Sequence, residues 1–108
     1  MTLYSVIGAG VAGLAVATEL SERGAEVQVF DPAGPPGPHG CSWWAGGMLA
    51  PWCEYENAEE PVLRFGKEAI GWWSAHTAVT KAGTLVVANK RDLPDMRRFL
   101  RRTEGFAE

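Results

Sequence analysis

The sequence contains few cysteines and no basic residue near its start, and each scarcity excludes a class of protein. Two cysteines among 108 residues are too few for a disulfide scaffold, and they fit a reducing cytoplasm. No Lys or Arg precedes Arg23, whereas a secretory signal peptide opens with basic residues. The uncharged stretch 1–18 is interrupted by glycines and ends at Glu19, so it does not predict a membrane span.

Basic residues are fewer than acidic residues over the whole chain, with 10 Lys and Arg against 13 Asp and Glu. The formal net charge of −3 gives no general reason to expect a nucleic-acid partner. A hydrophobic content of 46% with five tryptophans argues against disorder. A length of 108 residues suffices for one small domain, but not for a cofactor domain together with a separate substrate domain.

The first 31 residues predict a strand, a helix and a second strand. Residues 3–7 are β-branched and aromatic and predict a buried strand, whereas apolar spacing predicts a helix over 11–23, with Gly24 as its C′ glycine. Residues 26–31 alternate like a second strand. Strands joined through a helix are parallel, with a right-handed crossover. We therefore predict an α/β fold, the β-α-β start of a Rossmann-type doubly wound sheet, incomplete because parallel sheets need more strands.

The second half of the chain predicts helix, strand and helix. After a loop rich in Pro and Gly at 32–40, a helix is expected from Pro61 to His76, with His76 buried on its apolar face. A strand is expected over 84–88, and Asp92 is expected to cap a last helix. This half does not complete the doubly wound sheet.

The fingerprint Gly-Ala-Gly-Val-Ala-Gly at 8–13 lies directly after the first predicted strand and opens the first predicted helix. In this GxGxxG pattern the first glycine permits a tight turn, the second lets a pyrophosphate approach the backbone, and the third lets the helix pack closely on the strand. Asp31, at the end of the second strand, can accept hydrogen bonds from an adenosine ribose. The pattern predicts dinucleotide binding, and both NAD and FAD proteins use it. A glycine-rich turn without a ligand is the alternative.

The segment 41–54, CSWWAGGMLAPWCE, resembles the stretch after the dinucleotide motif in FAD-dependent glycine oxidases of the D-amino-acid oxidase superfamily. The resemblance covers essentially the whole chain. It implies FAD as cofactor and oxidation of glycine, or of another small amine or D-amino acid, to the imine with release of hydrogen peroxide, as in thiamine thiazole synthesis. It also implies that the substrate-binding residues come from sequence outside these 108 residues, and it identifies no catalytic residue within them.

Position by position, the resemblance implies a set of cofactor contacts along the first half of the chain. Its pyrophosphate and ribose contacts fall on Gly8, Gly10, Val11, Ala12, Gly13, Asp31 and Pro32, and its further phosphate and isoalloxazine contacts on Cys41, Ser42, Gly46, Gly47 and Met48. We accordingly expect residues 1–53 to form the N-terminal part of an FAD-binding domain. Residues 54–108 are expected to lead into the substrate domain.

Other residues of the sequence suggest further sites or partners. His39, Cys41 and Cys53 match no zinc set in spacing or number, so no metal site is predicted. Four arginines within 97–102 are expected on a solvated or docking face rather than on nucleic acid. An NAD(P)-binding protein of another family, and a non-catalytic remnant or interaction module, remain as alternatives. An incomplete fold leaves apolar surface unburied, so we expect an oligomer or dependence on the remaining sequence.

Overall fold

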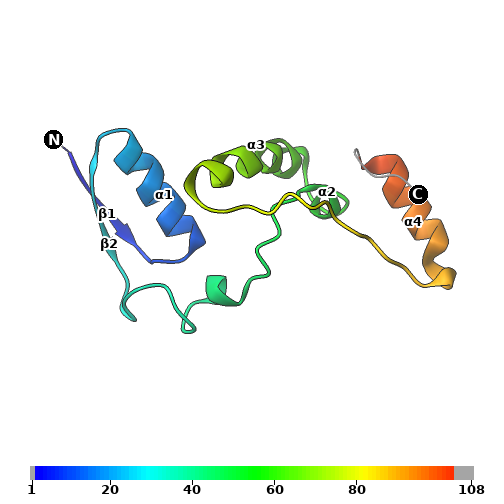
Figure 1. Cartoon of the computed structure of the whole chain (residues 1–108), viewed down its shortest axis with the longest axis horizontal. Helices are drawn as coiled ribbons and strands as arrows, with labels where there is room; N and C mark the ends of the chain where they lie inside the picture. Colours follow the sequence, from blue (N-terminus) through cyan, green and yellow to red (C-terminus); the bar gives the residue numbers. More distant parts are fainter. Residues whose placement is uncertain (1, 104–108) are drawn as a thin grey trace. The chain divides into compact units, whose positions relative to one another are not determined.

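The computed structural model describes residues 2–103, which divide into two compact units between Gly47 and Met48. The first unit contains β1 (Leu3–Ile7), α1 (Val11–Glu22), β2 (Glu26–Phe30) and the 3₁₀ helix η1 (Cys41–Trp44) (Figure 1). The second contains α2 (Trp52–Tyr55), α3 (Glu60–His76), the 3₁₀ helix η2 (Lys90–Asp92) and α4 (Leu93–Arg102).

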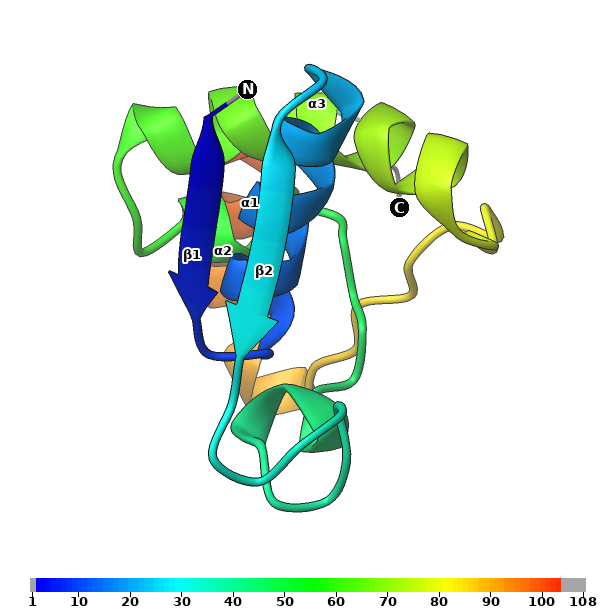
Figure 2. The same ribbon diagram turned by 90° about the vertical axis from the view of Figure 1, so that its left-hand side faces the viewer.

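The two strands form a parallel sheet that begins the α/β fold. They pair in a register that runs from Leu3 opposite Glu26 to Ile7 opposite Phe30. The ladder continues into the following turn, where the Gly8 N–H donates to the Phe30 carbonyl at 2.7 Å. Figure 2 shows β1 and β2 side by side with α1 across one face. The predicted β-α-β start of a Rossmann-type sheet is confirmed.

The end of α1 is set by a glycine, as the sequence predicts. Gly24 has a φ of +83°, a conformation that a side chain disfavours. Its N–H donates to the Ser21 carbonyl, and the next N–H, from Ala25, donates to the Leu20 carbonyl. These two bonds satisfy carbonyls that the helix leaves without partners, in the pattern of a Schellman motif. The chain thereby reverses into β2.

Close packing of α1 on the sheet depends on Gly13. A Cβ atom at this position would overlap the carbonyl oxygen of Gly8 and would lie 3.3 Å from Cγ1 of Val6. Val6 and Val27 are half-buried on the sheet face toward α1, and Ala17 of α1 is buried. The absence of a side chain at Gly13 therefore sets how closely the helix approaches the turn and β1.

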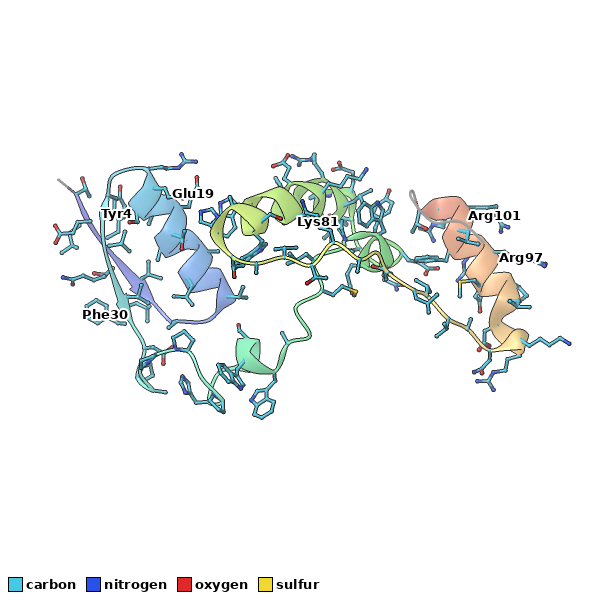
Figure 3. All side chains as sticks on the ribbon, viewed as in Figure 1. Tyr4, Glu19, Phe30, Lys81, Arg97 and Arg101 are labelled. Carbon is cyan, nitrogen blue, oxygen red and sulfur yellow. The ribbon has the colours of Figure 1, made fainter. Side chains whose placement is uncertain are left out.

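The opposite face of the sheet is open, which corrects the expectation of a buried strand. Ile7 is 79% exposed and Phe30 51% exposed, and Figure 3 shows Phe30 on the side away from α1. A parallel strand is buried only where both faces of its sheet are covered. Within residues 2–47 the helix α1 covers one face, so the alternate side chains of both strands reach solvent.

In the second unit, α3 begins at Glu60 with Pro61 in its first turn and packs aromatic rings near its end. The ring of Trp72 meets that of Trp73 edge to face at 4.9 Å and stacks on the imidazole of His76 at 4.1 Å. Nδ1 of His76 lies 2.7 Å from the Trp72 carbonyl oxygen. His76 is half-buried rather than buried, because its helix face is only partly covered.

The last helix carries its arginines largely in solvent, as the sequence predicts. Figure 3 shows Arg97 and Arg101 extending from α4. Arg98 pairs with Asp95 of the same helix at 3.5 Å and with Glu56, the C-cap residue of α2, at 3.6 Å. Phe99, on the other side of the helix, is buried. Arg98 therefore links α4 to the end of α2.

Two predicted features of the second unit are wrong. Residues 84–88 form no strand, and Leu85 and Val87 are 87% and 79% exposed, because their β propensity finds no neighbouring strand within residues 48–103. Asp92 is the N-cap residue of α4, but its side chain makes no capping bond and lies instead 3.3 Å from Nε of Arg91.

No helix within residues 2–103 is long and apolar enough to cross a membrane.

Replacing Gly13 with Ala is expected to lower the free energy of unfolding of the first unit by about 1–3 kcal/mol, the usual cost of overpacking. The added methyl would overlap backbone at Gly8, which cannot move aside as a side chain can. Gly71→Ala is the matched control, because Gly71 is also helical but its Cβ would meet open space. The control is expected to gain up to about 1 kcal/mol from helix propensity. Urea unfolding followed by circular dichroism measures both, and equal changes would contradict the packing role of Gly13.

Candidate dinucleotide-binding site

The glycine-rich loop between β1 and α1 exposes backbone donors. Gly8 has a φ of +103°, which allows the chain to turn sharply at the end of β1. Gly10 is the N-cap residue of α1 and offers no side chain to the helix. The first N–H groups of a helix have no intrahelical partner and lie at the positive end of its dipole. The Val11 and Ala12 N–H groups therefore lie at the positive end of α1.

Ser42 reaches this helix end from η1, thirty-one residues along the chain. Its hydroxyl oxygen accepts a hydrogen bond from the Val11 N–H at 3.0 Å. A Cβ atom at Gly10 would lie 3.3 Å from the same oxygen, so a side chain there would crowd the hydroxyl. The Val11 N–H is thereby bonded to Ser42, whose hydroxyl can still donate its own hydrogen close to the Gly10 backbone. A phosphate group needs N–H and O–H donors, and the Ser42 hydroxyl and the Ala12 N–H at the start of α1 are donors of that kind.

Asp31 lies immediately after β2 and contacts the same loop. Oδ2 accepts a hydrogen bond from the Ala9 N–H at 2.9 Å, and Oδ1 accepts one from the Ala33 N–H at 2.9 Å. The Ala9 and Ala33 N–H groups hold the pKa of the Asp31 carboxyl below its ordinary value, with a smaller contribution from His39. A carboxylate has about four acceptor sites, so two remain for ribose hydroxyls.

The segment that follows Asp31 is ordered by its own contacts. Nε2 of His39 lies 3.9 Å from Oδ1 of Asp31. The Trp44 indole donates to the Pro38 carbonyl oxygen at 2.8 Å, which ties η1 to the loop rich in Pro and Gly. These contacts hold the segment that carries Ser42, whereas Cys41, the residue before it, is an exposed free thiol.

The structure brings together only some of the residues named by the sequence. Gly8, Gly10, Val11, Ala12, Gly13, Asp31 and Ser42 all lie on the glycine-rich loop, on the start of α1 or on side chains that contact them. Pro32 follows Asp31 and is exposed. Gly46 and Gly47 are exposed with open space where a Cβ would be, whereas Met48 is exposed and belongs to the second unit. Among residues 2–103, no three His, Cys, Asp or Glu side chains gather as metal ligands require.

Sequence reasoning missed three participants in this site. Ala9 donates to Asp31 from a variable position of the fingerprint, and Ala33 donates to the same carboxylate through its backbone. No side-chain pattern signals such backbone contacts. The sequence predicts no metal site at His39 and gives it no other role, whereas the structure places its Nε2 3.9 Å from Oδ1 of Asp31.

Comparisons with known proteins agree with this geometry. Residues 4–108 match the DAO family, described as "FAD dependent oxidoreductase". Over 103 residues the chain is 53% identical to a Rhizobium etli protein named "Putative thiamine biosynthesis oxidoreductase ThiO". That alignment covers 94% of this chain and 31% of the relative, so the chain spans about a third of the relative's length. No solved structure matches the chain. Because the family match extends over nearly the entire sequence, the chain belongs to the DAO family of FAD-dependent oxidoreductases.

Proposed function

We propose that this chain is the FAD-binding part of an oxidase that converts glycine, or another small amine or D-amino acid, to the imine and releases hydrogen peroxide. The observation that supports FAD binding most directly is the group formed by Gly10, the Val11 N–H and the Ser42 hydroxyl at the start of α1. The similarity to a protein named as a thiamine biosynthesis oxidoreductase supports an oxidation step in that pathway. Family membership supports oxidoreductase chemistry.

The residue roles in this proposal follow the glycine-rich loop outward. The backbone at Gly8, Gly10, Val11, Ala12 and Gly13 holds the pyrophosphate, aided by Cys41 and Ser42. Asp31, with Pro32 beside it, accepts the ribose hydroxyls. The glycines at 46 and 47 let the backbone approach the flat isoalloxazine ring, and Met48 offers it a polarisable side chain.

FAD, when bound, supplies a two-electron oxidation at the carbon–nitrogen bond of the substrate, with dioxygen as the final acceptor. The residues of this chain hold and orient the cofactor, and residues outside it bind the substrate. In this proposal residues 1–53 form the N-terminal part of the FAD-binding domain, and 54–108 lead into the substrate domain. Orientation of the two reactants then requires both parts of the protein.

The proposal also covers the cellular compartment and the open face of the sheet. Cys41 and Cys53 are both free thiols, which supports a reducing cytoplasm. The exposed apolar side chains of Ile7 and Phe30 support burial of the open sheet face, either in an oligomer or against the remaining sequence.

The purified chain is expected to retain a flavin absorption spectrum after incubation with FAD and removal of free ligand. The Ser42 hydroxyl already lies at the start of α1, where the helix dipole favours a phosphate group. A colourless chain that retains NAD instead would overturn the proposed cofactor. If the chain retains neither nucleotide, the same measurement on the longer polypeptide decides whether the site needs the remaining sequence.

Gly10→Val is expected to abolish retention of FAD while the chain still folds. The backbone at Gly10 is extended, with φ −78° and ψ 179°, so a β-branched residue fits its conformation but fills the space beside Ser42. Gly40→Val is the matched control, because Gly40 is also extended, with φ −99°, and a Cβ there makes only ordinary contacts. Retained flavin is read from visible absorbance, and folding from circular dichroism. Equal retention by the two variants would count against phosphate binding at Gly10.

A further inference from the structure

The Ala9 N–H is held from outside the glycine-rich loop. Ala9 lies between two glycines, and the backbone on either side is tied to other elements: the Gly8 N–H bonds to Phe30, and the Gly10 carbonyl accepts from the Leu14 N–H. Between those bonds, the Ala9 N–H donates to Oδ2 of Asp31 at 2.9 Å. The orientation of the Ala9 peptide is therefore set by a side chain from the end of β2.

Asp31 is itself held in one position. The Ala33 N–H donates to its second carboxylate oxygen at 2.9 Å, which closes a turn over Pro32. The Asp31 side chain is 19% exposed, and it is a short side chain whose head group both bonds orient. An acceptor fixed in this way can restrict a flexible loop, because its own rotamer is already determined.

We propose that Asp31 is a positioning residue for the phosphate-binding turn, so that binding of a pyrophosphate group, and not only of a ribose, depends on its carboxylate. This inference rests on the proposed function of the same site. Asp31 acts through the peptide group between Gly8 and Ala9, whose N–H it accepts, and thereby fixes the backbone over which the phosphates lie. Ser42 fixes the adjoining turn of α1 through Val11.

Whether pyrophosphate binding weakens or strengthens when the Asp31 carboxylate is removed decides the proposal. A carboxylate close to a pyrophosphate repels it, so removal of the Asp31 charge alone would strengthen pyrophosphate binding. If the carboxylate positions the turn, its removal weakens that binding instead, despite the loss of repulsion. Inorganic pyrophosphate has no ribose, so it separates this effect from the loss of a ribose acceptor.

The test compares Asp31→Ala with Asp92→Ala in the full chain. Asp92 is the control because it is an aspartate whose carboxylate makes no capping bond to the helix it precedes. Amide exchange at Ala9, measured by nuclear magnetic resonance without ligand, is expected to accelerate roughly tenfold or more in Asp31→Ala. Pyrophosphate affinity, measured by titration, is expected to fall by a similar factor. Asp92→Ala is expected to change neither quantity.

Unchanged exchange at Ala9, or equal or tighter binding of pyrophosphate by Asp31→Ala, would overturn the proposal. Should Asp31→Ala fail to fold, Asp31→Asn keeps the side-chain size with one acceptor oxygen in place of two, and the same two measurements apply. Failure of the proposed function is distinguishable: a longer polypeptide with the remaining sequence that binds neither FAD nor pyrophosphate refutes that function, whereas Ala9 exchange without ligand still decides whether Asp31 holds the turn.

The lowered pKa of Asp31 gives a second prediction, which concerns stability at acid pH and the Ala9 amide proton that reports on it. The pKa of the Asp31 carboxyl is lowered by the Ala9 and Ala33 N–H groups, so its stabilising contribution is complete above the ordinary pKa of about 3.9 and is lost as pH falls through the lower folded value. The Ala9 amide proton resonance is expected to shift over that acid range, and Asp31→Ala is expected to abolish the shift. The titratable groups that face Asp31 within residues 2–103 include His39, whose Nε2 lies 3.9 Å from Oδ1 of Asp31. A shift that persists in the variant would contradict this assignment.

Discussion

The approach of α1 to the turn at Gly8 is the constraint on which the first unit depends. Because Gly13 has no side chain, the helix begins close to the end of β1, and its first N–H groups come to lie beside Gly10. A larger residue at Gly13 would displace the start of the helix from the turn, and the positive end of the helix dipole would move with it. The packing of α1 on the sheet and the geometry of the candidate phosphate site therefore both require that Gly13 has no side chain.

Two side chains from distant parts of the sequence complete what the glycines begin. Asp31 contacts the turn before Gly10, and Ser42 contacts the backbone after it. Glycines allow a loop to adopt an unusual conformation but do not select it, since they also enlarge the set of unfolded conformations. Selection requires bonds from outside the loop, and these two hydrogen bonds supply it. The glycines of the fingerprint thus allow the loop to adopt its conformation, whereas residues outside the fingerprint select that conformation.

The contrast between the two halves shows what local patterns can predict. Residues 3–30 were predictable because strand alternation, helical spacing and the C′ glycine all agree with the contacts that the unit forms. Residues 84–88 have strand-like composition, but a strand exists only where a partner pairs with it, and no local pattern reports the partner. The bond from Ala9 to Asp31 was likewise beyond prediction, because backbone donors are common to all residues and only the folded path selects one. His76 is half-buried where burial was predicted, since periodicity identifies a helix face but not how completely that face is covered.

The order of these elements along the chain has a consequence for synthesis. Within the part of the chain that the structure describes, the contacts that shape the glycine-rich loop are made by residues 2–42: β2 pairs with β1, Asp31 bonds to Ala9, and Ser42 bonds to Val11. Domains tend to fold in order from the N-terminus as the ribosome adds roughly 5–20 residues per second. Short sequence separations between contacting residues also favour rapid folding. The glycine-rich turn can therefore take shape on the nascent chain as soon as residues 1–42 have emerged, without a contact from the helices of the second unit.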